Sequence, residues 1–293
     1  MAYPRLIYEN LATGEQIEFS PYSQFHTNVA AEAVGLSDVR ATVNTVRAVG
    51  QHGSAFASTQ IDERAVTIKG MFRTLGNLNK SMLRRKLAHV LDPASPGRLT
   101  YILDNFRRQI ACRAETAPVI TPGRTADAYT VDLRCPSPFW EETTSSSQGL
   151  AGFMKNWKFF WEIPEEGFEF GLREENVFVE VVNSGDTASG MQITFTAGGA
   201  VTNPKLLNST TGEYLELTME MQAGDRVEVS TFYDRKTAVL IRDNTEYNVF
   251  QNVRAGSTWL QLPIGSSWFL VSADAGTVTL DVTITFTPLY LAV

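Results

Sequence analysis

The stretch DLRCPSPFW, residues 132–140, divides the chain into two parts of different character. Before it, Val131 and Leu133 lie on one side of an alternating apolar pattern, which predicts a strand. Pro136 and Pro138 have no backbone N–H group, so they cannot donate hydrogen bonds to a β-ladder. The sequence therefore predicts that the strand, and with it a domain, ends in this stretch.

The residues that follow have the composition of a loop. The run EETTSSSQG, residues 141–149, has no large apolar side chain and cannot hold itself in a packed core. A chain of 293 residues also exceeds what one hydrophobic core usually serves. We therefore predict an N-terminal domain at residues 1–142, a linker at 143–149 and a C-terminal domain at 150–293.

Composition and charge narrow the class of protein. Hydrophobic residues make up 43% of the chain and charged residues 19%, which is the composition of a folded protein. Residues 1–140 carry 16 Lys and Arg against 12 Asp and Glu (+4), and residues 141–293 carry 9 against 20 (−11), which together give the net charge of −7. The first value is too small to indicate nucleic-acid binding, and the second disfavours DNA or an anionic membrane as a partner.

No segment has the pattern of a targeting or membrane sequence. Charges and turn residues interrupt the N-terminal stretch MAYPRLIYENLATGEQIEFS, where a secretory signal needs an apolar core. No window approaches the roughly 18 consecutive apolar residues of a membrane span. We therefore expect no membrane partner.

The two cysteines, Cys112 and Cys135, are too few for a disulfide framework or a four-ligand zinc site. We expect ordinary buried thiols. A bridge would be sterically possible if their strands were neighbours, but a chain made in the cytosol normally keeps its thiols reduced.

The C-terminal half has a regular strand pattern. In TVTLDVTITF, residues 277–286, apolar side chains alternate with Thr and Asp, as in a strand with one solvated face. The same period recurs in YLELTMEM, VFVEVV and MQITFT, and turn signals such as NSGD, QAGD and RAGS separate these runs at intervals of about ten residues. This pattern predicts an antiparallel β-sandwich or jelly roll.

The N-terminal half is mixed. IYENLATGEQIEF predicts a hairpin with a Thr-Gly turn, and RAVTIKGMF and LTYILDN predict further strands. One helix is predicted within residues 77–93, because four apolar residues follow the i, i+4, i+7, i+8 pattern, an Asn caps the start and Asp-Pro ends it. The residues concerned are Leu83, Leu87, Val90 and Leu91, Asn77 or Asn79, and Asp92-Pro93. Arg84 and Lys86 are interpreted as the solvated shoulders of this helix, with Arg85 and His89 on its opposite face.

The sequence indicates neither an enzyme nor a cofactor or metal site. The three histidines, His26, His52 and His89, form no pair with metal-ligand spacing, and phosphate-binding loops and nucleophile elbows are absent. The acidic pairs Glu165-Glu166 and Glu174-Glu175 are adjacent residues, which point to opposite faces of a strand. They therefore form no two-carboxylate hydrolase site by themselves, and loop solvation explains them better.

Tryptophans in the C-terminal half are candidates for sugar stacking, because lectin sandwiches place a pyranose on an aromatic face. Trp259 and Trp268 lie within apolar strand patterns, so we expect both to pack in the core. Trp157 and Trp161 belong to NWKFFWEI, residues 156–163, which is expected to pack across the domain junction or against a partner.

Several of these segments together resemble the phage distal tail proteins of the siphophage tail-component family. The likeness runs nearly from end to end. It is carried by GEQIEF, GQHGSAF, DERAVTIKGMF, RRKLAHVLDP, LTYILDN, the junction DLRCPSPFW and the long segment NPKLLNSTTGEYLELTMEMQAGDRVEVSTFYDRKTAVLI. The resemblance implies an α+β N-terminal domain with a split-barrel-like sheet and one helix, followed by a galectin-like antiparallel β-sandwich.

The resemblance also implies a function and partners. It implies a virion protein, assembled in the host cytoplasm, whose N-terminal domains form a homo-hexameric ring that joins the tail tube protein to the tail-tip or baseplate hub proteins. DNA would meet the ring only in transit through its bore, and the C-terminal domains of some members hold receptor-binding proteins. The family implies no active site.

Two groups of residues are the candidates for this role. The ring-interface candidates are Gly50, Gln51, His52 and Gly53, which lie in the turn of GQHGSAF. Small residues in this turn suit the addition of a strand to a neighbouring copy.

The domain-junction candidates are Pro136, Pro138, Phe139 and Trp140.

The alternative function is that of a lectin-like adhesion protein. Galectins hold sugar with a set of His, Asn, Arg and Trp, and the C-terminal half has no histidine, so that set is not carried over.

Overall fold

The computed structural model describes residues 3–73, 80–124, 126–150, 153–154, 172–173 and 178–293. The chain forms two compact units. Unit 1 comprises residues 1–143 and 289–293, and unit 2 comprises residues 144–288. Asn77 and Asn79, the two acidic pairs and NWKFFWEI lie outside the described residues.

Unit 1 is a β-barrel with two helices in its described part. Its strands are β1 (Arg5–Asn10), β2 (Gln16–Ser20), β3 (Phe25–His26), β4 (Ala33–Val34), β5 (Ala41–Val46), β6 (Ala55–Ile61), β7 (Arg64–Phe72), β8 (Gly97–Leu103), β9 (Phe106–Ala114), β10 (Val119–Thr121), β11 (Ala128–Cys135), β12 (Trp140–Glu142) and β27 (Leu289–Tyr290). Its helices are α1 (Val29–Glu32) and α2 (Lys80–Val90).

The barrel follows the strand order β11-β7-β3-β2-β1-β8-β9 and closes where β9 pairs with β11. Alternating apolar residues point into it; β7, for example, buries every second side chain from Arg64 to Phe72. Helix α2 places Leu83, Leu87 and Val90 in the same core, as its apolar spacing predicted. The split-barrel-like sheet with a main helix is therefore confirmed, and α1 is a short addition that the sequence did not indicate.

Unit 2 is an antiparallel β-sandwich, also as predicted. Its strands are β13 (Ser146–Gly149), β14 (Phe153–Met154), β15 (Leu172–Arg173), β16 (Phe178–Asn183), β17 (Met191–Ala197), β18 (Val201–Thr202), β19 (Lys205–Asn208), β20 (Tyr214–Glu216), β21 (Glu220–Met221), β22 (Arg226–Ser230), β23 (Thr237–Arg242), β24 (Thr245–Asn248), β25 (Gly265–Ser272) and β26 (Leu280–Phe286), and two 3-10 turns are η1 (Phe250–Asn252) and η2 (Thr277–Thr279). A sheet of order β13-β26-β17-β22-β23-β24 and a sheet of order β16-β25-β19-β20 share one apolar core.

Two details of the predicted domain boundaries are corrected. Ser146–Gly149, placed in the linker, forms strand β13 and pairs with β26 from Ser146↔Phe286 to Gly149↔Thr283. Its side chains are exposed, so the pairing rests on backbone hydrogen bonds that a small-polar composition does not reveal. The last five residues, 289–293, belong to unit 1 rather than to the C-terminal domain.

A buried carboxylate in unit 2 gives an expected acid dependence of stability. Asp225 is 2% exposed and accepts bonds from Arg242 Nε at 2.8 Å, from Arg242 Nη2 at 2.5 Å and from the backbone of Gln222 at 2.7 Å. The hydrogen bonds from Arg242 are the main cause that holds the pKa of Asp225 below its usual value. The Asp225 carboxylate therefore stays ionised in the folded unit at pH values near 4, where the same group becomes protonated in the unfolded chain.

We expect Asp225→Asn to lower the melting temperature of unit 2 at pH 7 and to flatten its decline with acid. The contribution of Asp225 is present above about pH 4 and is lost as the pH falls from there towards the lower folded pKa. Thermal denaturation at pH 7 and in a series below pH 4 measures this. Asp234→Asn is the matched control, since Asp234 is 75% exposed beside Arg235. Equal acid dependence in both variants would contradict the prediction.

Candidate assembly interface and domain junction

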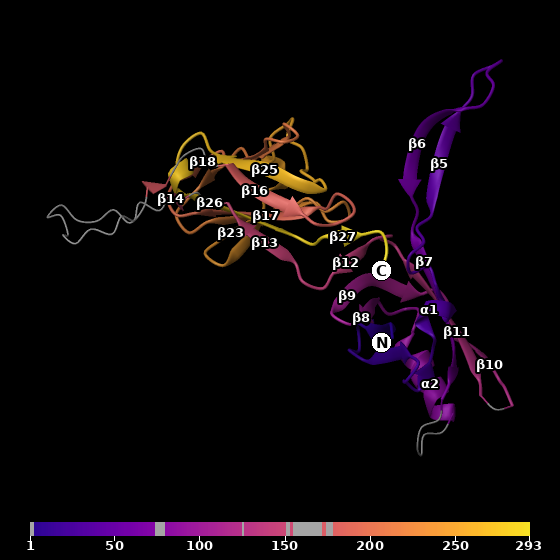
Figure 1. The fold of residues 1–293 in the computed structure, drawn as a ribbon. Coiled ribbons are helices and arrows are strands. Elements are labelled where there is room, and N and C mark those ends of the chain that lie inside the picture. The colour runs from indigo at the N-terminus through magenta and orange to yellow at the C-terminus, as the bar shows by residue number, and fades with distance from the viewer. Residues whose placement is uncertain (1–2, 74–79, 125, 151–152, 155–171, 174–177) are drawn as a thin grey trace, which may run out of the picture. The chain divides into compact units, whose positions relative to one another are not determined.

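A two-stranded arm projects from unit 1 (Figure 1). Strands β5 and β6 form a separate two-stranded sheet, with a register shift between Asn44 and Thr45, and every residue of both strands is exposed. The arm starts and ends at the barrel, where Asp62 N donates to Arg40 O at 2.9 Å. It adds no residue to the apolar core of unit 1.

The arm exposes large apolar side chains to solvent. They are Val43 (57% exposed), Val46 (62%), Val49 (108%), Phe56 (68%) and Ile61 (41%). A two-stranded hairpin without a packed face is only marginally stable in water, and its free edges can pair with another chain. The arm therefore leaves apolar side chains and free strand edges exposed in the single chain.

The four ring-interface candidates lie together at the tip of the arm, between β5 and β6. Gly50 and Gly53 both have φ of 80°, and a Cβ atom at either position would meet no heavy atom within 4 Å. Gln51 closes the turn: its Oε1 accepts from Ala48 N at 3.1 Å and its carbonyl oxygen accepts from Arg47 Nε at 2.9 Å. The side chain of His52 is exposed. The tip is thus held by backbone geometry that glycine permits, with its side chains free to contact another molecule.

The domain-junction candidates follow directly after β11, which ends at Cys135. Pro136 is exposed, Pro138 and Phe139 are half-buried, and Trp140 is 0% exposed at the start of β12. The indole Nε1 of Trp140 donates to the carbonyl oxygen of Leu36 at 2.9 Å. Trp140 is therefore part of the core of unit 1.

Arg64, the first residue of β7, lies beneath this junction and is 3% exposed. Its guanidinium donates to five carbonyl oxygens on three segments of unit 1. They are Gly35 O (2.7 Å), Leu36 O (3.0 Å), Asp38 O (3.2 Å), Pro138 O (2.8 Å) and Leu291 O (2.6 Å). The carbon Cζ also lies 5.9 Å from the centre of the Trp140 ring. One side chain therefore holds the loop after β4, the junction and the C-terminal segment together.

The electrostatics of Arg64 match this structural role. Burial lowers the pKa of its guanidinium below the ordinary value, and the charge of Asp38 nearby acts in the opposite direction. Five carbonyl dipoles take the place of water around the cation. Sequence reasoning missed Arg64, although an arginine inside the strand pattern DERAVTIKGMF was a usable signal.

The C-terminal segment completes the junction in unit 1. Strand β27 pairs with β12 through Trp140↔Tyr290 and Glu141↔Leu289, and the backbone oxygen of Val293 accepts from Ser37 Oγ at 2.8 Å. The chain thus leaves unit 1 through β12 and re-enters it through β27 on a directly paired strand.

We expect truncation after Pro288 to destabilise unit 1 by about 2–4 kcal/mol, because it removes a paired strand and leaves the buried guanidinium short of an acceptor. Thermal or urea denaturation of the shortened chain measures this. The control is truncation after Leu291, which keeps β27 and the carbonyl group that Arg64 contacts. Equal stability of both truncated chains and the full chain would show that the segment is dispensable.

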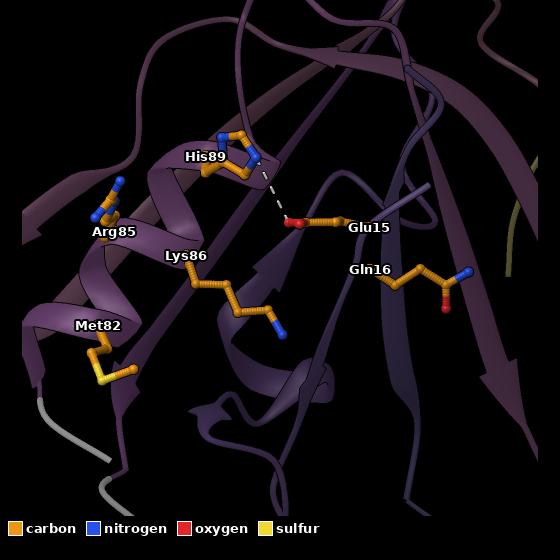
Figure 2. Close-up of a pocket in the computed structure, with 6 residues that line it drawn as sticks. All are labelled: Glu15, Gln16, Met82, Arg85, Lys86 and His89. Carbon is orange, nitrogen blue, oxygen red and sulfur yellow. Dashed lines mark ion pairs between the residues drawn. The ribbon is translucent and has the colours of Figure 1, made fainter. Parts of the chain in front are cut away.

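An open pocket lies along α2 (Figure 2). It is lined by Glu15, Gln16, Met82, Arg85, Lys86 and His89, all of them exposed, and His89 Nε2 lies 4.0 Å from Glu15 Oε2. Its residues on α2 form a solvated helix face, as the sequence predicted for Arg85 and His89, and Glu15 and Gln16 face them from the start of β2. Arg84 differs from its predicted solvated position, because it donates to the buried Asp127 at 2.6 Å.

The tryptophans of unit 2 divide into two environments. Trp259 is half-buried against the core and stacks on Phe250 with ring centres 5.2 Å apart. Trp268, expected in the core, is 46% exposed on β25. The pattern WFLVS misled because both faces of this strand carry apolar side chains: Phe269 and Val271 point into the core, and Trp268 and Leu270 lie on the outer face.

A row of mainly apolar side chains crosses the outer face of the four-stranded sheet next to Trp268. Phe178 pairs with Leu270, Leu270 with Leu207, and Leu207 with Tyr214. Trp268 pairs with Glu180 in the adjacent row. Trp157 and Trp161 lie outside the described residues.

The described residues contain neither a metal-ligand cluster nor a membrane-spanning helix. In this part of the chain, no group of three or more His, Cys, Asp or Glu side chains could hold a metal ion. Among the described helices, none is long and apolar enough to cross a membrane.

Comparison with known families gives two matches. Residues 14–133 match the phage tail protein RIFT-related domain, and residues 184–290 match the C-terminal domain of the siphovirus-type tail component. No match was found among curated protein sequences.

Solved structures share the fold of the whole chain. The Dit (gp 19.1) protein of phage SPP1, described as a paradigm of hub adsorption apparatus in phages that infect Gram-positive hosts, is 14% identical, with a TM-score of 0.69 over 98% of this chain and 99% of that one. A chain of the phage P2 baseplate, in its activated conformation with Ca, is 11% identical, with a TM-score of 0.52 over 100% of both chains. A second p2 baseplate structure, with Sr, gives 10% identity, a TM-score of 0.51 and 99% coverage of both.

A RIFT-related barrel followed by this C-terminal domain defines the class of protein: the chain is a siphovirus-type tail component. Within that class it belongs to the siphophage distal tail protein family, as its end-to-end likeness in fold to SPP1 Dit agrees. It is a structural component of the virion tail.

Proposed function

We propose that six copies of this chain form a closed ring through unit 1. The ring joins the tail tube protein to the tail-tip or baseplate hub proteins, and DNA passes through its bore during infection. Unit 2 folds independently and offers the attachment point for receptor-binding proteins. The chain acts as a scaffold without catalytic activity.

The arm is the observation that carries this proposal. Its strands expose Val43, Val46 and Phe56, although solvent-exposed apolar side chains on a free two-stranded sheet gain nothing for the isolated chain. When the arm packs on the next copy, the same side chains become buried and the free strand edges form backbone hydrogen bonds with that copy. In this proposal the arm packs on a surface of the next copy other than that copy's arm, so the contact is heterologous, and rotation about an axis closes it into a ring.

Glycine variants at the tip test the proposal. Gly50→Val combined with Gly53→Val forces two branched residues into positive φ, which costs about 1–2 kcal/mol for each residue. We expect native mass spectrometry to show hexamers for the unchanged chain and a large loss of hexamers for the variant. Gly14→Val is the matched control, since Gly14 has φ of 73° in a turn away from the arm, with no heavy atom within 4 Å of the added Cβ atom. Equal assembly of all three chains would contradict a role of the tip.

The second candidate function, carbohydrate binding by unit 2, is favoured by the exposure of Trp268. Stacking of a pyranose needs an accessible ring together with convergent polar groups that fix the hydroxyls. Around Trp268 the row from Phe178 to Tyr214 is mainly apolar, and Glu180 is the paired acid.

We therefore expect no specific signal for the full chain on a glycan array. The comparison variants are Trp268→Ala and Tyr233→Ala, since Tyr233 is 80% exposed elsewhere on unit 2. Specific binding that Trp268→Ala removes and Tyr233→Ala preserves would establish the lectin function instead.

A further inference from the structure

The two cysteines of the chain meet inside the barrel of unit 1. Cys112 on β9 is 3% exposed and Cys135 at the end of β11 is 0% exposed. Strands β9 and β11 are the pair that closes the barrel, with Leu133 opposite Ala114 and Arg134 opposite Arg113. One step further along this antiparallel register, Cys135 lies opposite Cys112. Both thiols belong to the same apolar core of the barrel.

The hydrogen-bond pattern shows which kind of pair this is. Glu115 N donates to Asp132 O at 2.8 Å, so Asp132 and Glu115 are a hydrogen-bonded pair. Bonded and non-bonded pairs alternate along an antiparallel ladder. Cys135 and Cys112, three steps away, therefore occupy a non-hydrogen-bonded position.

At such a position the Cα atoms are about 4.5 Å apart and the side chains are closest, which falls within the range of about 4.4–6.8 Å that disulfides require.

We propose that Cys112 and Cys135 form an intrachain disulfide when the folded chain passes from a reducing compartment to an oxidising medium, with a low-molecular-weight disulfide as the oxidant. The inference concerns the barrel alone and does not depend on ring formation. Virion proteins of this kind are made in a reducing cytosol and later persist outside the cell, where disulfides are stable.

The reaction is a two-step thiol–disulfide exchange. The thiolate of one cysteine attacks a sulfur of oxidised glutathione, which forms a mixed disulfide and releases one glutathione thiolate. The thiolate of the second cysteine then attacks the protein sulfur of the mixed disulfide, forms the Cys112–Cys135 bond and releases the second glutathione. The two cysteines lose two electrons and two protons, and one oxidised glutathione becomes two reduced molecules.

Burial determines the rate of this exchange. The hydrogen bond to Cys135 and burial both raise the pKa of Cys112, so the closed barrel holds the thiol rather than the reactive thiolate. The exchange therefore requires the seam between β9 and β11 to open, and we expect the rate to rise with urea below the unfolding transition. The Cys112–Cys135 disulfide links β9 and β11 covalently at the place where these two strands close the barrel.

The test uses the full chain, purified with a reductant and then incubated with oxidised glutathione in urea concentrations below its unfolding transition. Free thiols are alkylated after unfolding, and the intact mass is measured. We expect a species that lacks two hydrogens and takes up no alkylating agent, with a unit 1 melting temperature raised by about 5–10 °C and restored by dithiothreitol.

Cys112→Ala and Cys135→Ala are the matched controls, and neither should form the bridged species or gain melting temperature. Two results would overturn the proposal: both thiols remain alkylatable at every urea concentration, or the bridged chain melts no higher than the reduced chain.

Discussion

Arg64→Met is expected to lower the free energy of unfolding of unit 1 by about 3–5 kcal/mol, the range for breaking a buried charged network. Methionine fills much of the space of arginine but donates no hydrogen bonds. Five carbonyl oxygens would lose their donor, among them Leu36 O, Pro138 O and Leu291 O. Urea denaturation followed by tryptophan fluorescence measures the change, and Trp140 is the tryptophan that belongs to unit 1.

Arg134→Met is the matched control for this prediction. Arg134 lies on β11 and is 46% exposed, and it forms ion pairs with Glu63 and Glu115 at the surface. Exposed pairs contribute about 0–1 kcal/mol, so this variant should change stability by no more than that. Arg64→Lys should fall between the two, because a single ammonium keeps the charge but has only three donors. A loss below about 1 kcal/mol for Arg64→Met would mean that the junction does not depend on this side chain.

Removal of the arm is expected to abolish ring assembly while leaving unit 1 folded. Residues 41–61 would be replaced by an Asn-Gly turn, which suits the ends because Asp62 N already donates to Arg40 O across them. Since the arm adds no residue to the core, the free energy of unfolding should change by less than about 1 kcal/mol. Size-exclusion chromatography with light scattering should report a monomer at concentrations where the unchanged chain forms a ring.

The control for the arm variant alters a different exposed hairpin. Val119→Ser on β10 removes an apolar side chain that is 55% exposed but leaves the arm intact. This variant should assemble like the unchanged chain. A ring formed by the chain without its arm would transfer the assembly role to another surface of unit 1.

The sequence predicted those parts of the fold that depend on local periodicity. The alternation in RAVTIKGMF and TVTLDVTITF identified β7 and β26, and the spacing of Leu83, Leu87 and Val90 identified α2. The proline residues after β11 marked the end of that strand, because proline has no N–H group to donate to a β-ladder in any tertiary environment.

Features that depend on distant partners could not be predicted in the same way. Arg64 donates to carbonyl groups that are distant in the sequence, such as that of Leu291. Strand β27 pairs with β12 although all of unit 2 lies between them in the sequence. The exposed position of Trp268 depends on which face of β25 meets the core, and a strand that is apolar on both faces does not show this. Long-range pairing, rather than composition, decided each of these cases.

Electron microscopy of the purified full chain tests the central proposal most directly. We expect single-particle averages along the symmetry axis to show a closed ring of six copies with an open bore, in which each arm, β5 and β6, lies on the neighbouring copy. Averages that show only monomers in the presence of the tail tube protein, or a ring built by unit 2, would contradict the account.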